Sequence, residues 1–115
     1  MSRPEWQSIS EALSALPTGV AEAARRRIRG SVAVSRPVVC PLLDTDSGTC
    51  LVYAARPVAC RAYGFYAERQ FVLGCGRIEE IGGQTPDVTW GNHAALEDEL
   101  GSLGPALELA EWLAA

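Results

Sequence analysis

The cysteine-bearing stretch of this chain reads CPLLDTDSGTCLVYAARPVACRAY from Cys40 to Tyr63, and Cys75 follows it. These residues hold all four cysteines of the 115-residue protein. Four thiolates are the number that completes a tetrahedral zinc site or holds one [4Fe–4S] cluster. The leading interpretation of this stretch is therefore a metal site.

The spacing of the cysteines bears on the kind of metal. Nine residues lie between the first and second cysteine, nine between the second and third, and fourteen between the third and fourth. Structural zinc sites usually take ligands in C-x2-C pairs, because a tight turn supplies two thiolates at once. The spacing here argues against a zinc ribbon or finger. An atypical zinc site and a [4Fe–4S] cluster stay open, and the cluster is narrowly favoured because its irons accept thiolates from separate segments.

Other roles for the cysteines are less well supported. The N-terminus lacks the apolar stretch of a secretory signal, and no apolar run is long enough to cross a membrane. We therefore expect a cytoplasmic protein, in which disulfides are rare. A catalytic cysteine needs a neighbouring base, and His93 is the single histidine. His93 and Asp44 are possible substitute ligands if one cysteine does not bind the metal.

The residues around the cysteines resemble a known family. Cys-Pro-Leu-Leu-Asp, Gly-x-Cys-Leu-Val-Tyr and Arg-Pro-x-x-Cys-Arg-x-Tyr, within residues 38–75, are similar to the YkgJ-like cysteine-cluster family of zinc- or iron-chelating domains. That family includes flagellin lysine N-methylases, which are linked to an iron–sulfur cluster. Its upstream C-x2-C-x2-C-C motif is missing here, so the chain resembles a short member with one site. By position, the resemblance implies metal ligands at Cys40, Cys50, Cys60 and Cys75.

Three other side chains of the motif are expected to support the bound cofactor. Arg56 and Arg61 can offset the charge of four thiolates, or donate to backbone carbonyls that hold the cysteine loops. Tyr53 could shield the site or donate its hydroxyl to it, although a plain scaffold role is the preferred interpretation for Tyr53 and Pro57.

Helices are predicted at both ends of the chain. Residues 4–29 form a helix that Pro17 breaks in two, and Thr18 is a candidate cap for the second part, which ends at Gly30. Near the C-terminus, Asn92 caps a helix over 93–100 and Pro105 opens one over 106–113. Apolar stripes at helical spacing mark the buried faces of the first two helices: Ile9, Leu13 and Leu16, then Val20, Ala24 and Ile28. Five apolar residues of the tail are expected to pack on them: Leu96, Leu100, Leu103, Leu107 and Trp112.

The centre of the chain is predicted to be irregular. We expect an extended lead-in over 31–39, a turn over 44–48, one helical turn around Tyr53, a hairpin over 63–73 and a loop over 82–86. The predicted fold is a single metal-binding cysteine-cluster domain over residues 1–115. It is small, α+β and mainly helical, with N- and C-terminal helices packed around an irregular cysteine-bearing centre.

Charge is distributed unevenly along the chain, whose net charge is −4. Arginines gather before the cysteines, whereas the residues after Arg77 carry eight acids and no base. A nucleic-acid role would need a broader basic surface with stacking aromatics, so none is expected. The acidic C-terminal helices could instead bind a protein partner.

These observations predict a small metal-binding protein with a structural, redox or metal-carrying role and no activity of its own. One alternative, from the resemblance, is an enzyme or accessory subunit in a protein-modifying, methyl-transfer-like system. It is disfavoured because the chain has no nucleotide-binding glycine motif. The other alternative is a protein-interaction module with a structural zinc. The oligomeric state stays open.

Overall fold

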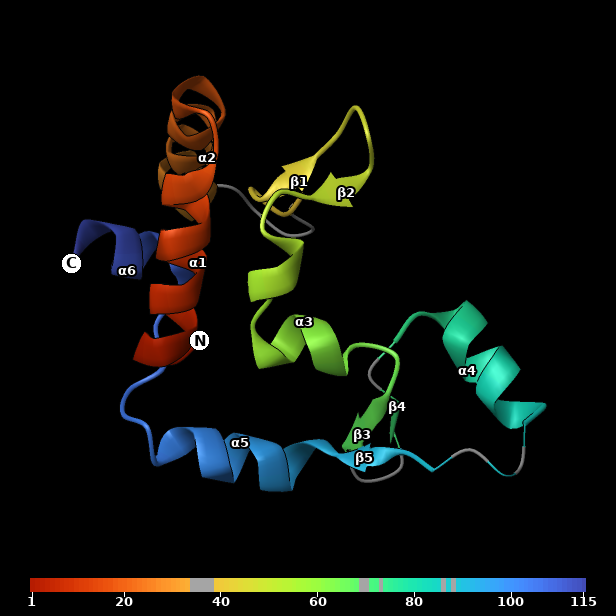
Figure 1. Cartoon of the computed structure of the whole chain (residues 1–115). Coiled ribbons are helices and arrows are strands. Elements are labelled where there is room, and N and C mark those ends of the chain that lie inside the picture. The colour runs from red at the N-terminus through yellow and green to blue at the C-terminus, as the bar shows by residue number, and fades with distance from the viewer. Residues whose placement is uncertain (34–38, 69–70, 73, 86, 88) are drawn as a thin grey trace.

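The computed structural model describes residues 1–33, 39–68, 71–72, 74–85, 87 and 89–115. Figure 1 shows helices at both ends of the chain, with short strands and turns between them. The chain therefore has the small, mainly helical α+β fold that the sequence predicts. No helix in the described ranges is long and apolar enough to cross a membrane.

Helices α1 (Arg3–Ala15) and α2 (Thr18–Gly30) are separated at Pro17, which confirms the predicted break. The predicted cap of α2 is wrong, because Pro17 takes that position and Thr18 is already helical. The carbonyl of Pro17 accepts the first hydrogen bond of the helix, from the N–H of Ala21 at 3.0 Å. Pro17 therefore ends one helix and starts the next.

The buried core lies where α1 and α2 meet the centre of the chain. Ile9 and Leu13 of α1 are buried as predicted, and Leu16 packs at their edge. The predicted stripe on α2 is wrong at one position, because Val20 is 40% exposed and Ala21 is buried instead. The remaining core residues are Ala24, Ile28, Leu42 and Val52. Burying an aliphatic side chain contributes about 1.5–3 kcal/mol, so this cluster is the main source of stability.

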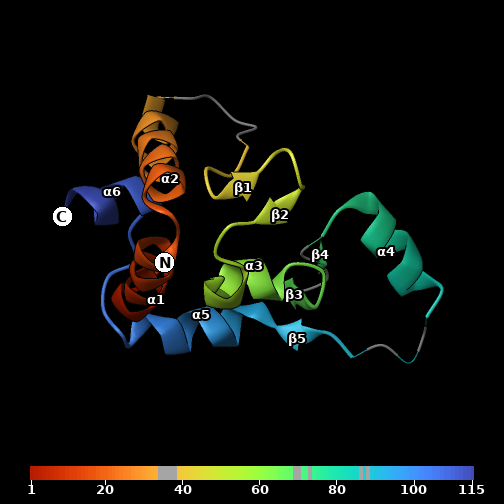
Figure 2. The ribbon, with the colours of Figure 1, turned by 45° about the horizontal axis from the view of Figure 1, so that its top comes forward.

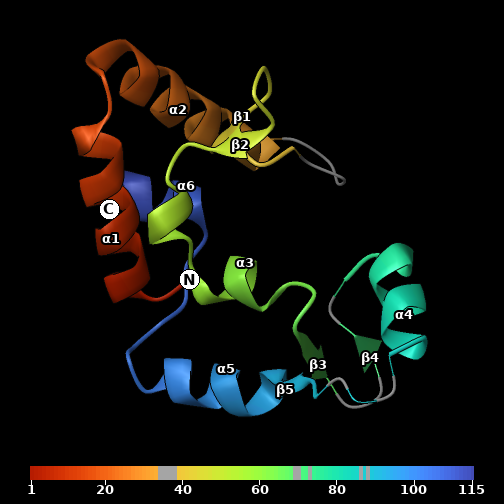
Figure 3. The same ribbon diagram turned by 45° about the vertical axis from the view of Figure 1, so that its right-hand side comes forward.

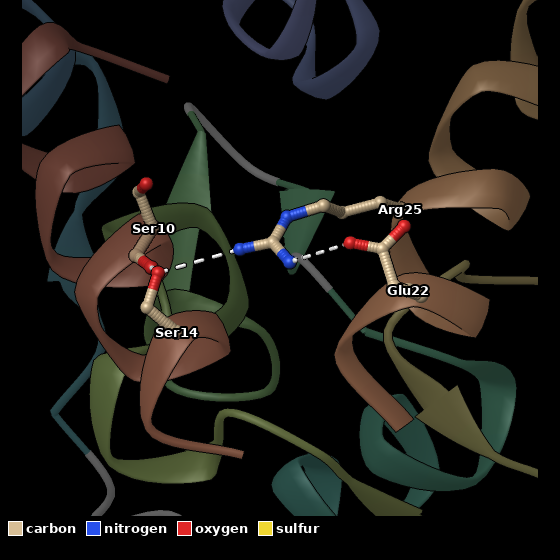
Figure 4. A network of polar contacts seen from close by, with 4 residues as sticks. All are labelled: Ser10, Ser14, Glu22 and Arg25. Carbon is tan, nitrogen blue, oxygen red and sulfur yellow. Dashed lines mark hydrogen bonds and ion pairs between the residues drawn. The ribbon is translucent and has the colours of Figure 1, made fainter. Parts of the chain in front are cut away.

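Polar contacts join α1 and α2 outside the core (Figure 4). One guanidinium nitrogen of Arg25 donates to the hydroxyl of Ser14 at 3.3 Å, and another lies 3.4 Å from a carboxylate oxygen of Glu22. The Ser14 hydroxyl in turn donates to the carbonyl of Ser10. Because these groups are exposed, their contribution to stability is small.

The segment after α2 begins with a 3-10 turn, η1 (Ser31–Ala33). The predicted extended lead-in is therefore wrong at its start, and residues 34–38 of it lie outside the described residues. The hydroxyl of Ser31 donates to the carbonyl of Ile28 at 2.6 Å, which prolongs the helical winding beyond α2.

Strands β1 (Leu43–Asp44) and β2 (Thr49–Cys50) form an antiparallel hairpin around the predicted turn. The carboxylate of Asp44 accepts a hydrogen bond from the backbone N–H of Asp46 at 3.0 Å, inside the turn. Gly48 has φ +71°, a left-handed conformation that favours glycine. The chemistry of the turn therefore favours this hairpin.

Two short helical segments follow the hairpin. The 3-10 turn η2 (Tyr53–Ala55) confirms the helical turn predicted before Pro57. Helix α3 (Val58–Ala62) was not expected, because five residues are too few for a periodic pattern. It carries Cys60 and Arg61.

A second, three-stranded sheet lies further along the chain. Strands β3 (Tyr66–Glu68) and β4 (Phe71–Val72) confirm the predicted hairpin. Strand β5 (Gly91–Asn92) adds to the other side of β3 in parallel, giving the order β4-β3-β5. The ring of Tyr66 occupies the space that a side chain at Gly91 would need.

Helix α4 (Gly76–Gly83) connects the hairpin to β5. The predicted loop over 82–86 therefore starts two residues late, at Gln84. The ring of Trp90 lies so close to Gly82 that a Cβ there would be 2.6 Å from it. The missing side chain thus lets a ring pack on the end of the helix.

Helix α5 (His93–Gly101) begins as predicted, and the side-chain oxygen of Asn92 accepts the N–H of Ala95 at 3.1 Å. Helix α6 (Leu109–Ala114) begins later than predicted. Its start is set by Glu108, whose backbone N–H donates to the carboxylate of Glu111 at 2.7 Å. A capping box, and not Pro105, therefore opens the last helix.

Only part of the predicted C-terminal packing occurs. Helix α6 packs on α1 and α2, whereas α5, the helix to which Leu96 and Leu100 belong, contacts β3. Leu103 is 52% exposed. The backbones of Met1 and Leu107 exchange hydrogen bonds of 2.9 and 3.0 Å, and the indole N–H of Trp112 donates to the Met1 carbonyl at 3.0 Å.

The described residues thus form two regions, which we call the body (residues 1–33, 39–62 and 107–115) and the arm (the described residues between 63 and 106). Figure 2 shows α6 against the two N-terminal helices, and Figure 3 shows β3, β4 and α4 extending away from them. The Cα radius of gyration is 15.7 Å. A compact chain of this size would have about 13 Å, so the arm gives the molecule an open shape.

Candidate metal centre

The β1–β2 hairpin positions two of the four cysteines. Cys50 pairs with Leu43 across the hairpin, and the N–H of Leu43 donates to the carbonyl of Cys40 at 3.0 Å. The N–H of Leu51 donates to the carbonyl of Leu42 at 2.9 Å, which extends the pairing beyond the strands. Cys40 and Cys50 therefore enter the site from adjoining segments of one hairpin.

Helix α3 positions Cys60. Its N-terminal turn is held from α1, because a carboxylate oxygen of Glu5 accepts the N–H of Val58 at 2.8 Å. The N–H of Cys60 itself donates to the carbonyl of Pro57 at 3.0 Å. A tertiary contact across 53 residues thus sets the place of this cysteine.

Burial and nearby charges raise the pKa of one body cysteine, Cys60. Although Cys60 is largely exposed, the surrounding chain desolvates its sulfur, and this burial raises the pKa of the thiol. Negative charge on Cys40 and then on Cys50 raises that pKa further, and the Arg56 guanidinium opposes the rise. Charges act in this way only at short range in salt solution. The pKa of the Cys60 thiol is therefore raised first by its own burial and then by the charges of Cys40 and Cys50.

Cys75 lies elsewhere, at the cap position of α4 in the arm. Its side chain is exposed, and the backbone N–H groups of Ile78 and Arg77 lower the pKa of its thiol. All four cysteines are free thiols. Across the described ranges, no three Cys, His, Asp or Glu side chains are arranged to hold a metal ion as they stand.

The three predicted supporting residues lie together between η2 and α3. The Arg61 side chain donates to the carbonyls of Arg56 and Ala54 at 2.8 and 2.7 Å. The Arg56 guanidinium donates to the carbonyl of Tyr53 at 3.1 Å and lies 3.7 Å from the centre of its ring. Arg61 therefore braces the loop before Cys60 by one of its two expected routes, and Tyr53 contacts Arg56 as scaffold. Arg56 adds a positive charge near Cys60.

Glu5 also holds the site region, although it is not among the residues that the sequence predicts for the site. Its second carboxylate oxygen accepts both the backbone N–H and the hydroxyl of Ser2, at 2.6 and 2.8 Å. Burial raises the pKa of Glu5, but the hydrogen bonds from Val58 and Ser2 outweigh it, so the pKa lies below its usual value. The Ser-x-x-Glu spacing at residues 2–5 is a capping-box signal and could have identified Glu5.

The two possible substitute ligands have other contacts. Asp44 accepts hydrogen bonds from the Ser47 hydroxyl and the Asp46 N–H, and these bonds lower its pKa. The ring nitrogen Nε2 of His93 lies 3.4 Å from a carboxylate oxygen of Glu97 on the same helix. Asp44 lies at the end of β1, and His93 lies in the arm. Within the described residues, neither side chain belongs to a group of three that could hold a metal ion.

Cys40 also lines a cavity of about 740 Å³ between α2 and the hairpin. Arg27 lies on its wall, where its Nε donates to the carbonyl of Pro41 at 3.0 Å. The apolar part of the wall includes Val20 and Leu51. Solvent therefore reaches the first cysteine from the α2 side.

Comparisons with protein-family models, with curated proteins and with solved structures found no match to this chain.

Proposed function

We propose that this chain is a small cytoplasmic metal-binding protein that holds one metal centre through Cys40, Cys50, Cys60 and Cys75. The centre is a [4Fe–4S] cluster or, as the close alternative, a zinc ion. Its role is structural, redox or metal-carrying, and the chain has no turnover of its own. The observation that supports this proposal is the presence of four free thiols, two of which, Cys40 and Cys50, lie in adjoining segments of one hairpin.

The chemistry of the donor set supports this class of centre. Thiolates are soft ligands that suit zinc and iron–sulfur clusters. The nearby carboxylates of Glu5 and Asp44 already accept backbone hydrogen bonds, which leaves sulfur as the main donor. Arg56 can offset part of the negative charge that four thiolates would bring. When bound, such a centre supplies a cross-link between the hairpin and α3, and, if it is a cluster, an electron-transfer group.

The identity of the metal is tested by purifying the protein without oxygen and measuring iron, sulfide, zinc and visible absorption. About four irons per chain and a brown colour support the cluster, whereas about one zinc in a colourless protein supports the tetrahedral site. Absence of all metal from both the purified and the reconstituted protein contradicts the proposal.

A matched pair of variants adds a second test. Cys50→Ser should abolish stoichiometric metal binding and lower the unfolding temperature of the loaded protein, because metal binding free energy adds to folding free energy. Asp46→Asn, in the same hairpin, should leave both unchanged. Equal metal content in the two variants would count against the thiolate site.

A second candidate function, docking to a basic protein partner, is favoured by α5. Glu97, Asp98 and Glu99 are exposed on consecutive positions of this helix. Reversal of all three to lysine should abolish binding to such a partner while metal content is kept, and Glu11→Lys on α1 is the control. The binding should also weaken with added salt, since surface charges are screened beyond about 8 Å at physiological ionic strength. Binding that survives the triple reversal contradicts this role.

A further inference from the structure

The cavity of about 740 Å³ between α2 and the hairpin has features of a binding site for a small molecule. Figure 3 shows the hairpin beside α2. Pockets that bind small molecules have volumes of about 300–1,000 Å³, with mostly apolar walls and a few polar groups that orient the ligand. The cavity lies in that range, and Cys40 is the one predicted metal ligand in its wall. The other residues of the wall indicate what it would bind.

Helix α2 turns a second face, distinct from its core face, toward the cavity. Ala24 and Ile28 are buried in the core. Val20, Ala23 and Arg27 line the cavity instead. These three residues are spaced by three and four positions, which places them on one side of a helix. The second face therefore combines apolar side chains with one positive charge.

Small residues keep the helical side of the cavity open. Gly19 and Gly30 belong to the wall, and a Cβ on either one would meet no described atom within 4 Å. Val20 supplies exposed apolar surface from α2, and the half-buried side chains of Leu43 and Leu51 supply it from the hairpin. An apolar part of a ligand would therefore contact both walls.

Arg27 supplies a donor that is already oriented. Its Nε donates to the carbonyl of Pro41 at 3.0 Å, so the side chain reaches from α2 to the hairpin and is held there. Among the described residues, the two terminal nitrogens of this guanidinium have no hydrogen-bond or ion-pair partner. Arginine binds carboxylates through pairs of parallel N–H bonds. Its terminal N–H groups are therefore open to an anionic ligand.

Two aspartates on the hairpin side of the wall limit the charge of that ligand. Both carboxylate oxygens of Asp44 accept hydrogen bonds inside the turn, from the Asp46 N–H at 3.0 Å and the Ser47 hydroxyl at 2.8 Å. Asp46 also belongs to the wall, and its side chain is exposed. Because like charges repel at short range, a second carboxylate on the ligand would be repelled by these two side chains.

We propose that this cavity binds an aliphatic monocarboxylate, with the carboxylate on the Arg27 guanidinium and the hydrocarbon chain against Val20, Leu43 and Leu51. Arg27 disfavours an amine in place of the carboxylate, and the two aspartates disfavour a dicarboxylate. The proposal does not depend on the metal centre, since no thiol takes part in holding the ligand.

The test begins with calorimetric titration of the unmodified protein with octanoate. Two compounds of the same chain length are compared with it: octanol, which lacks the charge, and octanedioate, which carries two. An N-acetylated leucine tripeptide with a free C-terminal carboxylate represents a peptide source of the same chemistry. Methyl NMR spectra of the samples locate binding, with Val20 and Leu51 as reporters of the cavity and Ile81 in the arm as the control.

Variants of α2 form the second arm of the test. Arg27→Gln removes the charge, and Arg27→Lys keeps a charge without the planar guanidinium. Val20→Asp places a carboxylate in the apolar wall. Arg26→Gln is the matched control, because Arg26 is exposed on the same helix and does not line the cavity. Circular dichroism establishes that each variant is folded.

Octanoate should bind at one site per chain, about tenfold or more tightly than octanol and octanedioate, and should shift the methyl signals of Val20 and Leu51 but not of Ile81. Arg27→Gln and Val20→Asp should each weaken binding about tenfold, and Arg27→Lys about threefold. Arg26→Gln should leave it unchanged.

Equal affinity for octanoate and octanol overturns the role of Arg27, and this comparison decides the matter even if the Arg27 variants do not fold. Absence of binding, or shifts confined to methyl groups outside the cavity, overturns the site. Tighter binding of the tripeptide than of octanoate overturns the assignment to a free acid.

Discussion

The body and the arm both contain helices and short strands, yet different interactions hold the two regions. In the body, apolar side chains from α1, α2, α6 and the centre meet in one core. In the arm, aromatic rings lie on glycines: Tyr66 on Gly91 and Trp90 on Gly82. Such contacts between a ring and a glycine order the backbone but bury little apolar surface area. The comparison teaches that helical content alone does not show where the stability of this chain resides.

The largest expected effect comes from truncating one core side chain. Leu13 is 1% exposed, and Leu13→Ala should lower the free energy of unfolding by about 2–5 kcal/mol, since it removes apolar contacts and leaves a cavity. Ile81→Ala in the arm should change it by less than about 0.5 kcal/mol. Denaturant unfolding followed by circular dichroism measures both. Similar losses in the two variants would remove the distinction between the regions.

The next effect concerns the contact between α1 and α3. Glu5→Ala removes the acceptor for the N–H of Val58 and for Ser2, and it should cost about 1–2 kcal/mol for partly exposed, charge-assisted bonds. Glu11→Ala, on the exposed side of α1, is the control and should cost much less. Thermal unfolding of the two variants is the measurement.

The same carboxylate predicts a pH dependence. Because the folded-state pKa of Glu5 is lowered, its stabilisation is complete above the unfolded-state pKa of about 4.3. It is lost as the pH falls through the folded-state value, since the unfolded chain then binds the proton more readily. The difference in stability between the unmodified protein and Glu5→Ala should therefore shrink below about pH 4.3. A constant difference from pH 7 to pH 3 contradicts this assignment.

The last two substitutions should have effects that are confined to the arm. Gly64→Ala places a side chain at φ +86° and should destabilise the junction between the body and the arm by about 1–2 kcal/mol. Gly83→Ala, where a Cβ meets nothing within 4 Å, should stabilise α4 by about 0.4–1 kcal/mol. Amide exchange should change in the arm alone for both. Changes that spread to α1 and α2 would show that the regions unfold together.

Local patterns in the sequence predicted much of this fold. The periodicity of Ile9 and Leu13, the break at Pro17 and the cap at Asn92 depend on neighbouring residues, and the structure confirms them. Helix α3 and strand β5 could not be predicted in this way. The first is too short to show a period, and the second forms by pairing with residues 25 positions earlier.

The candidate site shows the same limit. The thiol chemistry and the bracing role of Arg61 follow from residue types and short spacings. The position of the helix that carries Cys60 depends on the contact between Glu5 and Val58, which sequence spacing does not reveal. The assignment of Cys75 to a separate region likewise depends on the packing of α4.

Contact between the two ends of the chain has a consequence for variation in length. Since α6 returns to α1 and α2 only after the arm, the arm is a loop whose closure costs entropy during folding. That cost grows slowly with length, by about 0.6 kcal/mol for each doubling. Segments inserted into or removed from the arm should therefore leave the core folded. A change that separates Met1 from Leu107 and Trp112 would instead detach the first and last helices from each other and so disrupt the core.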